Sequence, residues 1–334
     1  MGDFMEKQVK TIGILTSGGD APGMNAAVRA AARTALSKGL KVYGIREGYN
    51  GLIEDNVFEM DMRSVSNVLQ YGGTCLKTAR SPLFKTEEGM QKAIETCKKY
   101  NIEGIVAIGG DGSYRGARDL SLRGIPCVGV PGTIDNDISS TDETIGFDTA
   151  MNTAMLMIDR LRDTSQSHNR CSVVEVMGRH CGDIALTTGI AVGATVILVP
   201  EIEYDLQKDV IDRIKFGLKH NKHHFIVIVA EGVCADKKDF SVFNIAEKIQ
   251  EETGVVSRAT VLGHVQRGGT PTVRDRSLAS RMGIYAAQLL IHGIGNRVVC
   301  LKDNKLTDMD IYEALEIPRT FDEELYKAAH DISI

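Results

Sequence analysis

The stretch 11-TIGILTSGGDAPGMNAAVRAAARTALSKG-39 combines two patterns that decide the fold class. Residues 11–17 are mostly apolar or β-branched, as expected of a strand that is buried on both faces. After a glycine-rich turn, residues 23–39 carry the Ala-rich, amphipathic pattern of a helix. A buried strand followed by a helix is the repeating unit of a parallel sheet, so we predict an α/β fold.

The same alternation continues along the chain. Further strand candidates are 41–45, 104–110, 125–130, 172–177, 195–200, 225–231, 259–263 and 297–301. Helix candidates include 88–101, 147–164, 206–221 and 278–293. A chain of 334 residues is long enough for two domains. We therefore predict two similar α/β domains with a boundary near residue 146.

The composition indicates a globular protein and argues against several functional classes. Hydrophobic residues make up 43% of the chain and charged residues 25%, and the net charge of −5 offers no general basic surface to nucleic acid. The seven cysteines form no CxxC pair, which favours reduced thiols over a disulfide framework. Residues 1–10 lack the apolar core of a signal peptide, and no apolar run approaches the roughly 20 residues of a membrane helix. We expect a cytoplasmic protein.

Two glycine-rich turns after strand candidates could bind phosphate. In 16-TSGGDAPGMNAAVR-29 a Gly-Gly pair precedes a helix whose N-terminal N–H groups attract anions, although a plain turn would also need glycine. The turn 108-IGGDGSYRGA-117 repeats the GGD pattern and places Asp111 at a strand end, where open α/β sheets bind ligands. Asp111 could hold Mg²⁺ against phosphate oxygens or cap the next helix. Because GGD occurs twice, we favour a nucleotide-phosphate site, even though neither the P-loop nor the GxGxxG pattern is present.

An acidic loop, 130-VPGTIDNDISSTDETIG-146, follows the strand candidate at 125–130. Asp135 and Asp137 point the same way if the backbone between them is extended. One carboxylate could then act as a general base while the other orients a metal-bound water or a basic side chain. A loop of Asx turns would have the same composition.

Basic residues that could clamp anions recur near the predicted strand ends. Each one alone is most simply a solvated surface residue, but arginine suits bidentate phosphate recognition. Together they indicate nucleotide phosphates near Gly19, Arg80 and Asp111, and a phosphorylated substrate near the remaining set. Glu231 could accept hydrogen bonds from sugar hydroxyls. The basic residues are Arg80, Arg162, Arg170, Arg179, His180, Arg258, His264 and Arg267.

The motifs SGGDAPGMNAA, GGTCLKTAR, IGGDGS, PGTIDND, SVVEVMGRHCGD and ATVLGHVQRGG together resemble the bacterial ATP-dependent 6-phosphofructokinases, from about Thr11 to Leu315. The resemblance implies transfer of the ATP γ-phosphoryl group to the 1-hydroxyl of fructose 6-phosphate, the committed step of glycolysis. It also implies two three-layer (αβα), Rossmann-like domains and a homotetramer with active sites shared between subunits. The ATP-binding domain would comprise residues 1–146 and about 266–310, and the fructose 6-phosphate-binding domain residues 147–265 and about 311–334.

The resemblance also implies roles for individual residues. Asp135 would be the general base toward the sugar hydroxyl, and Asp137 would support the metal or hold an arginine. Arg179 and Arg80 would stabilise negative charge in the transition state, and Thr133 would position the transferred phosphoryl group.

Two sets of binding residues follow from the same resemblance. The ATP site would consist of Gly19, Arg80, Ser81, Gly110, Asp111, Gly112 and Ser113, with Asp111 directing Mg²⁺. The sugar-phosphate site would consist of Thr133, Ile134, Asp135, Met177, Gly178, Arg179, Glu231, His264, Val265, Gln266 and Arg267, with Arg170 and Arg258 reaching it from the neighbouring subunit.

Two glycines indicate the phosphoryl donor. Pyrophosphate-using relatives tend to carry a second Asp after GGD and a Lys within the PGTIDND motif, whereas this chain has Gly112 and Gly132. Both leave space for the α-phosphate end of ATP, so we predict ATP.

The effector site of the resembling family is matched less completely. Arg29, Arg33, Arg162 and Lys222 fit its sites for ADP and phosphoenolpyruvate, which are the candidate effectors. Met62, Thr195 and His220 replace an arginine, a metal-binding glutamate and a lysine. We expect activation by Mg-ADP to be weakened or lost, while an effector anion still binds.

Three alternatives remain open from the sequence. They are a diphosphate-dependent phosphofructokinase, an NAD- or lipid-type kinase with a GGDG turn, and a catalytically silent nucleotide-sensing protein. PGTIDND and the arginine set argue against the second. The third would have lost its base or metal ligand, yet Asp135, Asp111 and Arg179 are present.

Overall fold

The computed structural model describes residues 9–235 and 240–333. The expectation that no signal peptide is present concerns residues 1–10, of which 1–8 lie outside the described ranges. The chain divides into two compact units. The first unit combines the described residues up to Ile134 with Ile138–Thr149 and Arg267–Arg319. The second contains Asp135–Asp137, the described residues of Ala150–Gln266, and those from Thr320 onward.

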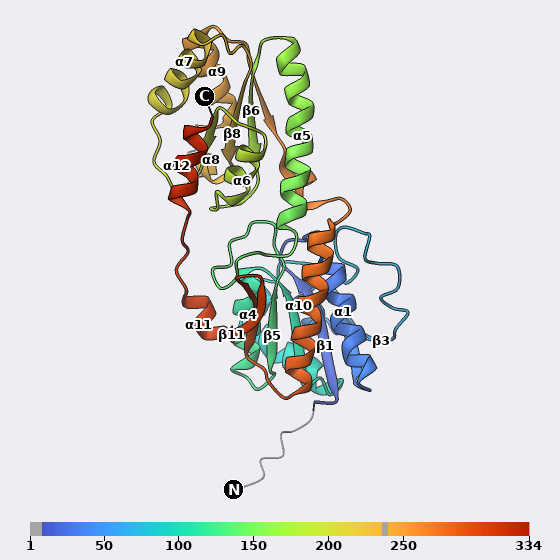
Figure 1. Cartoon of the computed structure of the whole chain (residues 1–334). Coiled ribbons are helices and arrows are strands. Elements are labelled where there is room, and N and C mark those ends of the chain that lie inside the picture. Colours follow the sequence, from blue (N-terminus) through green and yellow to red (C-terminus); the bar gives the residue numbers. More distant parts are fainter. Residues whose placement is uncertain (1–8, 236–239, 334) are drawn as a thin grey trace. The chain divides into compact units, whose positions relative to one another are not determined.

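The first unit is built on a seven-stranded sheet (Figure 1). Its spatial order is β11-β10-β5-β4-β1-β2-β3. The five central strands are parallel, while β3 and β11 pair antiparallel at the two edges. The strands are β1 (Thr11–Ser17), β2 (Lys41–Ile45), β3 (Val57–Met60), β4 (Gly104–Gly109), β5 (Cys127–Pro131), β10 (Arg297–Lys302) and β11 (Lys305–Asp310).

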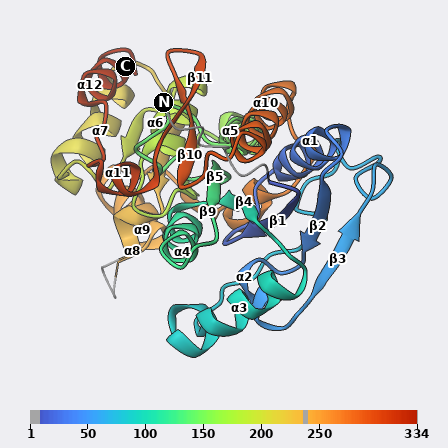
Figure 2. The same ribbon diagram turned by 90° about the horizontal axis from the view of Figure 1, so that it is seen from below.

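Helices cover both faces of this sheet (Figure 2). On one face, α1 and α10 pack against each other and against β1, β4 and β5. On the other face, α2, α3, α4 and α11 share one hydrophobic core with the strands, centred on fully buried side chains such as Leu15, Ile105 and Leu120. The elements are α1 (Met24–Ser37), α2 (Tyr49–Ile53), the 3₁₀ turn η1 (Leu83–Lys85), α3 (Glu87–Lys99), α4 (Asp111–Ser121), α10 (Val273–Ile291) and α11 (Ile311–Glu316).

The second unit contains a four-stranded parallel sheet in the order β7-β8-β6-β9. Helix α9 packs on β6 and β9, and α6 packs on β7 and β8. The strands are β6 (Cys171–Val176), β7 (Val196–Leu198), β8 (Phe225–Ala230) and β9 (Ser257–Val261). The other elements are α5 (Phe147–Ser167), α6 (Asp183–Ala191), the π-helical turn η2 (Leu206–Ile211), α7 (Asp212–Lys219), α8 (Gly232–Ala235), α9 (Val242–Thr253), the 3₁₀ segment η3 (Gly263–Arg267) and α12 (Glu323–Asp331).

The predicted α/β class with mostly parallel sheets is confirmed, and several details differ. The edge strands β3 and β11 were not predicted, because neither is a continuous apolar run. The helix predicted over 206–221 begins with six π-helical residues before α7. Strand β9 starts at Ser257 instead of residue 259, which places Arg258 inside the strand. Within the described ranges, no helix is long and apolar enough to span a membrane.

Candidate active site

Two predicted catalytic residues of the second unit form an ion pair. The Asp135 side chain is only 3% exposed, and its Oδ2 atom lies 3.4 Å from Nε of Arg179. Asp137 Oδ2 lies 3.9 Å from Nη1 of the same guanidinium, which is 49% exposed. The prediction that the two carboxylates face one way assumed an extended backbone between them; Asn136 instead has φ of 51°, and both carboxylates nevertheless face Arg179. A buried carboxylate next to a half-exposed cation can accept a proton beside a group that stabilises anionic charge.

Two residues in and next to this ion pair have a left-handed backbone conformation. Arg179 has φ of 55° and Asn136, between the two aspartates, has φ of 51°. The Asn136 amide donates from Nδ2 to Asp183 Oδ2 at 3.1 Å, which ties the acidic loop to the start of α6. Asparagine adopts this conformation readily, whereas a left-handed arginine costs of order 1–3 kcal/mol and persists where the surroundings hold it. The surrounding structure therefore holds Arg179 in a strained backbone conformation in which its guanidinium faces Asp135 and Asp137.

The Glu231 carboxylate holds the turn that carries Arg179. Its Oε1 atom accepts the backbone N–H of Gly178 at 3.1 Å and that of Arg179 at 2.6 Å. Gly178 has φ of 141°, and a β-carbon there would lie 2.4 Å from the Cys181 carbonyl oxygen, so only glycine fits. Glu231 was predicted to contact sugar hydroxyls. In the structure its carboxylate also accepts two backbone hydrogen bonds from the turn.

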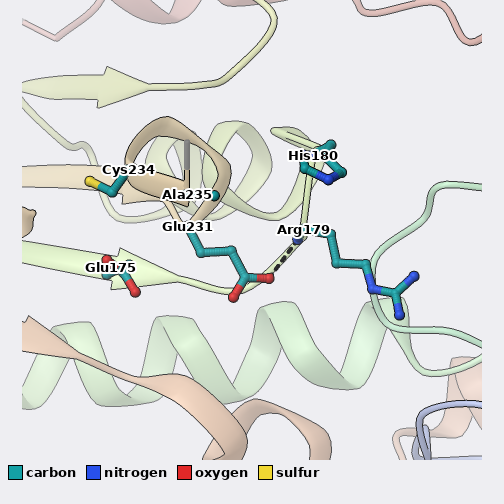
Figure 3. A pocket seen from close by; sticks show the side chains of 6 residues that line it. All are labelled: Glu175, Arg179, His180, Glu231, Cys234 and Ala235. Atoms are coloured by element: carbon teal, nitrogen blue, oxygen red, sulfur yellow. Dashed lines mark hydrogen bonds between the residues drawn. The ribbon is translucent and has the colours of Figure 1, made fainter. Parts of the chain in front are cut away.

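An open hollow of about 550 Å³ lies beside this turn (Figure 3). It has the size of a small-molecule site. Glu175, at the end of β6, was not singled out from the sequence, because a lone polar residue within a strand carries no functional signal. Burial and the nearby charge of Glu231 raise the pKa of Glu175. The hollow is lined by Glu175, Arg179, His180, Glu231, Cys234 and Ala235.

Two predicted substrate arginines lie away from this hollow. Arg179 and Glu231 follow the C-terminal ends of β6 and β8, whereas Arg170 precedes β6. Arg258 on β9 pairs in register with Ser172, near the beginning of β6. A six-residue strand spans about 20 Å, so these two arginines occupy the opposite end of the sheet.

The segment after β9 contains a further set of predicted sugar-phosphate residues. His264 and Val265 are exposed in η3, whereas Gln266 is fully buried and donates from Nε2 to the Gly263 carbonyl at 3.2 Å. None of these three lines the hollow. Met177 is buried directly after β6.

The first unit carries the two glycine-rich turns at neighbouring strand ends. Strand β1 pairs with β4, so the turns that follow them lie side by side. Ser113 donates from Oγ to the Ser17 carbonyl at 3.0 Å, which links the second turn to the first. The predicted substrate residue Arg267 lies against the first turn and donates from Nη1 to the Asp20 carbonyl at 3.2 Å. A β-carbon at Gly19 would lie 2.6 Å from that Nη1 atom, so a side chain at this position would displace the Arg267 guanidinium.

The predicted metal ligand Asp111 has a partner that the sequence analysis missed. Its two oxygens accept from Nε and Nη2 of Arg115 at 2.9 and 3.2 Å. The four-residue spacing within α4 could have indicated this pair, since such residues are neighbours on a helix. Within the described ranges, no cluster of three or more His, Cys, Asp or Glu side chains could hold a metal ion.

The two donor-selecting glycines differ in their surroundings. A β-carbon at Gly112 would meet no atom within 4 Å, as the prediction of open space requires. At Gly132 a β-carbon would lie 3.0 Å from Met24 Cε and 3.1 Å from Ile108 Cγ2. Core side chains thus occupy the space that a side chain at Gly132 would need. This crowding was not predicted from the sequence. Nearby, Thr133 donates its N–H to the Ile145 carbonyl, and Ile134 is fully buried.

A buried carboxylate on α10 holds the start of α5, whose first residues up to Thr149 belong to the first unit. Asp275 accepts from Gly146 N at 2.7 Å, from Thr149 N at 2.8 Å and from Thr149 Oγ1 at 2.5 Å. It thereby caps α5 from α10. Burial raises the pKa of Asp275 to about 6, and these hydrogen bonds oppose that effect.

The predicted effector residues fall into one group in each unit. In the first, Arg33 donates from Nη2 to the Met62 carbonyl at 3.2 Å, and burial and the charge of Arg33 lower the pKa of Arg29. In the second, burial and the charges of Arg162 and Arg213 lower the pKa of Lys222.

The second group is larger than predicted. Burial, Arg162 and Lys222 lower the pKa of His224, so Arg213 and His224 join the predicted pair. Arg213 could not be found from the sequence because tertiary packing brings it there, whereas His224 lies only two residues after Lys222.

Comparison with known proteins identifies the family of the chain. The family described as Phosphofructokinase matches residues 11–290. The chain belongs to the phosphofructokinase family. A curated relative, the ATP-dependent 6-phosphofructokinase of Clostridium tetani, is 55% identical over 325 residues, covering 97% of this chain and 100% of the relative.

Solved structures of the family have the same fold. The phosphofructokinase of Saccharomyces cerevisiae superposes with a TM-score of 0.85 at 33% identity, over 97% of this chain and 48% of the yeast chain. The Pichia pastoris phosphofructokinase in the T-state gives 0.86 at 34% identity, over 100% of this chain and 40% of that chain. The chain thus spans about half or less of these two larger phosphofructokinases.

Proposed function

We propose that this chain transfers the γ-phosphoryl group of ATP to the 1-hydroxyl of D-fructose 6-phosphate, with Asp135 as the general base. The chain is an ATP-dependent 6-phosphofructokinase, like the relative that it matches at 55% identity over the relative's full length. The products are fructose 1,6-bisphosphate and ADP. The observation that carries the mechanism is the buried Asp135 carboxylate facing the Arg179 guanidinium at 3.4 Å.

Asp135 removes the proton from the attacking hydroxyl. A carboxylate that is only 3% exposed is shielded from water, and it stays close to a cation that favours its charged form. Arg179 stabilises the negative charge that develops on the transferred phosphoryl group, since guanidinium groups match phosphate oxygens bidentately. Asp137 holds the same guanidinium in place, and Thr133 positions the phosphoryl group.

The second unit binds the sugar phosphate. The hollow beside Arg179 offers the Glu231 carboxylate to sugar hydroxyls and the Arg179 guanidinium to phosphate. Met177, Gly178 and the η3 residues His264, Val265 and Gln266 complete the set in this unit, and the proposed contacts from the first unit are Ile134 and Arg267. Arg170 and Arg258 lie at the opposite end of the sheet, which supports a role at the site of a neighbouring subunit in a homotetramer.

The first unit binds ATP at its paired glycine-rich turns. Backbone N–H groups at Gly19 and at the start of α4 face the phosphates, and Arg80 and Ser81 contact the nucleotide. The residues of the second turn are Gly110, Asp111, Gly112 and Ser113. The open space at Gly112 supports ATP over pyrophosphate as the donor.

We assign Mg²⁺ to the nucleotide and not to a cage of protein ligands. Asp111 is 44% exposed in the first turn of α4, which fits an ion that is held mainly by phosphate oxygens and water. When bound, Mg²⁺ would neutralise charge on the phosphates. Asp111 would then exchange its contact with Arg115 for one with the ion or its water.

The proposal extends to regulation and location. Arg29, Arg33, Arg162 and Lys222 form an effector site for an anion such as phosphoenolpyruvate, while Met62, Thr195 and His220 weaken the response to Mg-ADP. Strong relief by ADP of inhibition by phosphoenolpyruvate would contradict this expectation. A cytoplasmic location is supported by the seven cysteines, all within the described ranges, none of which forms a disulfide.

An aldolase-coupled assay with fructose 6-phosphate tests the activity, using ATP and pyrophosphate in turn. We expect turnover with ATP and Mg²⁺ only, and comparable turnover with pyrophosphate would favour the diphosphate-dependent alternative. Asp135→Ala should lower kcat by about 10²–10⁴-fold while sugar-phosphate binding is largely kept. Asp142→Ala is the matched control, because that carboxylate is 46% exposed and contacts Lys302. Near-normal turnover of Asp135→Ala would refute the mechanism.

A further inference from the structure

The segment that carries Arg80 has no helix or strand to support it. Residues Tyr71–Pro82, which we term the nucleotide loop, lie between β3 and η1 as irregular backbone with one turn at Cys75–Leu76. Loops of this length without regular structure are usually either mobile or held for a functional reason. The contacts that fix the nucleotide loop as far as Thr78 therefore set the path on which the chain reaches Arg80 and Ser81.

A directed chain of hydrogen bonds attaches the loop to β1. The fully buried hydroxyl of Thr16 donates to the Lys77 carbonyl at 2.8 Å, and it lies 2.8 Å from Oγ1 of Thr74. Because its only proton is used on the carbonyl, the Thr16 hydroxyl must accept from Thr74. Thr74 Oγ1 in turn accepts from the Leu76 N–H at 3.3 Å. One buried hydroxyl thus binds both ends of the turn from Thr74 to Lys77.

The Asn25 side chain attaches the beginning of the loop to α1. Asn25 is 3% exposed, and its Oδ1 atom accepts the Cys75 N–H at 2.7 Å. Its Nδ2 atom donates to the Tyr71 carbonyl at 3.1 Å. The orientation of the amide is fixed, since an N–H can only donate and a carbonyl can only accept.

Two further contacts complete the attachment. Thr78 donates from Oγ1 to the Gly18 carbonyl at 2.8 Å, and Leu76 is 1% exposed with its carbonyl accepting the Glu47 N–H at 2.9 Å. The nucleotide loop therefore contacts the glycine-rich turn 16–29. We proposed above that the backbone of this turn faces the phosphates of ATP. These side chains fix the position of the nucleotide loop relative to the glycine-rich turn, and both segments are predicted parts of the ATP site.

We propose that Thr16 and Asn25 are positioning residues that set the nucleotide loop for ATP. This inference rests on the proposed function, because it takes Arg80 and Ser81 as ATP contacts. The partners of the Thr16 hydroxyl belong to the nucleotide loop, while its methyl group packs in the core like that of valine. The polar atom can thus be removed while the packing volume is kept, which separates positioning from folding.

Thr16→Val tests the inference and Thr16→Ser is the matched control, since serine keeps the hydroxyl. Thr16→Val leaves the Lys77 carbonyl without its donor, so we expect the KM for ATP to rise about tenfold or more. The KM for fructose 6-phosphate should stay within about twofold of the wild type, and Thr16→Ser should resemble the wild type. Hydrogen exchange of peptides covering residues 71–82 should accelerate in the valine variant alone.

Several results would overturn the inference. They are an unchanged KM for ATP, a parallel rise in both KM values, or equal damage by serine and valine. If Thr16→Val does not fold, Asn25→Ala breaks the other attachment and must give the same split between the two substrates.

Arg80→Ala separates this inference from the proposed function. If Arg80→Ala keeps the wild-type KM for ATP, the assignment of Arg80 to the ATP site fails. Faster hydrogen exchange of the nucleotide loop in Thr16→Val would still show that Thr16 attaches the loop to β1.

Discussion

Replacing Arg179 by glycine and by alanine should separate the catalytic cost of this residue from its conformational cost. Both variants remove the guanidinium that faces Asp135 at 3.4 Å. An arginine that stabilises phosphoryl-transfer charge is worth about 10³–10⁵ in kcat, so both variants should lose at least about 10³-fold. Only glycine relieves the left-handed backbone at this position, where φ is 55°.

The stabilities of the two variants can be estimated from the same geometry. Two unit charges 3.4 Å apart attract by about 5 kcal/mol at an effective dielectric constant of about 20. Because the Arg179 side chain is 49% exposed, solvent reduces this to about 1 kcal/mol, which both variants lose. A left-handed alanine costs about 1–2 kcal/mol, and the greater unfolded-state freedom of glycine offsets about 0.5–1 kcal/mol of the relief. Arg179→Gly should therefore be more stable than Arg179→Ala by about 0.5–1 kcal/mol.

Urea unfolding at pH 7, followed by circular dichroism, measures the difference in the free energy of unfolding, and the coupled assay measures kcat. If Arg179→Gly is less stable than Arg179→Ala, the left-handed backbone at this position is not strained. If either variant keeps more than about a tenth of wild-type kcat, Arg179 does not stabilise the transition state.

Three further predictions concern other parts of the two units. The pKa of about 6 for Asp275 lies above its ordinary value of 3.8, so its contribution of about 3 kcal/mol is present below pH 4 and is lost as the pH rises through 6. Urea unfolding at pH 4 and pH 7 should show this loss in the wild type and not in Asp275→Asn. Gly112→Ala should stabilise the protein by about 0.5–1 kcal/mol, because the position is helical and open, whereas Gly132→Ala should destabilise it by about 1 kcal/mol or more through crowding, both read as unfolding midpoints. Glu231→Gln should raise the KM for fructose 6-phosphate several-fold, since it loosens the turn at Arg179, and an unchanged KM would contradict that role.

The central strands were predictable because burial on both faces leaves a plain signal. Strand β4, GIVAIG, and strand β8, FIVIVA, consist of apolar residues and glycine and are fully buried. The edge strands carry no such run. Strand β11, KLTDMD, contains three charged residues and is only partly covered, so its pairing with β10 arises from the tertiary fold.

Parts of the candidate site were also predictable, for a different reason. Residues that follow parallel strands are collected at one edge of the sheet, so the two glycine-rich turns could be grouped from their positions alone. Contacts that depend on side-chain direction could not. The crowding at Gly132, the clamp from Glu231 to the turn and the left-handed Arg179 all depend on backbone angles that one sequence does not encode locally.

The order of strands in the seven-stranded sheet has a consequence for how the protein is made. Strand β5 emerges from the ribosome well over a hundred residues before β10, with which it pairs at Val128 and Gly129. During that interval the nascent chain exposes an unpaired strand edge, which is a hazard for association with other chains. The segment from β6 to β9 is synthesised in the meantime and contains a whole parallel sheet of its own. We expect this inserted sheet to form first, so that β5 completes its pairing only after strands that are translated later.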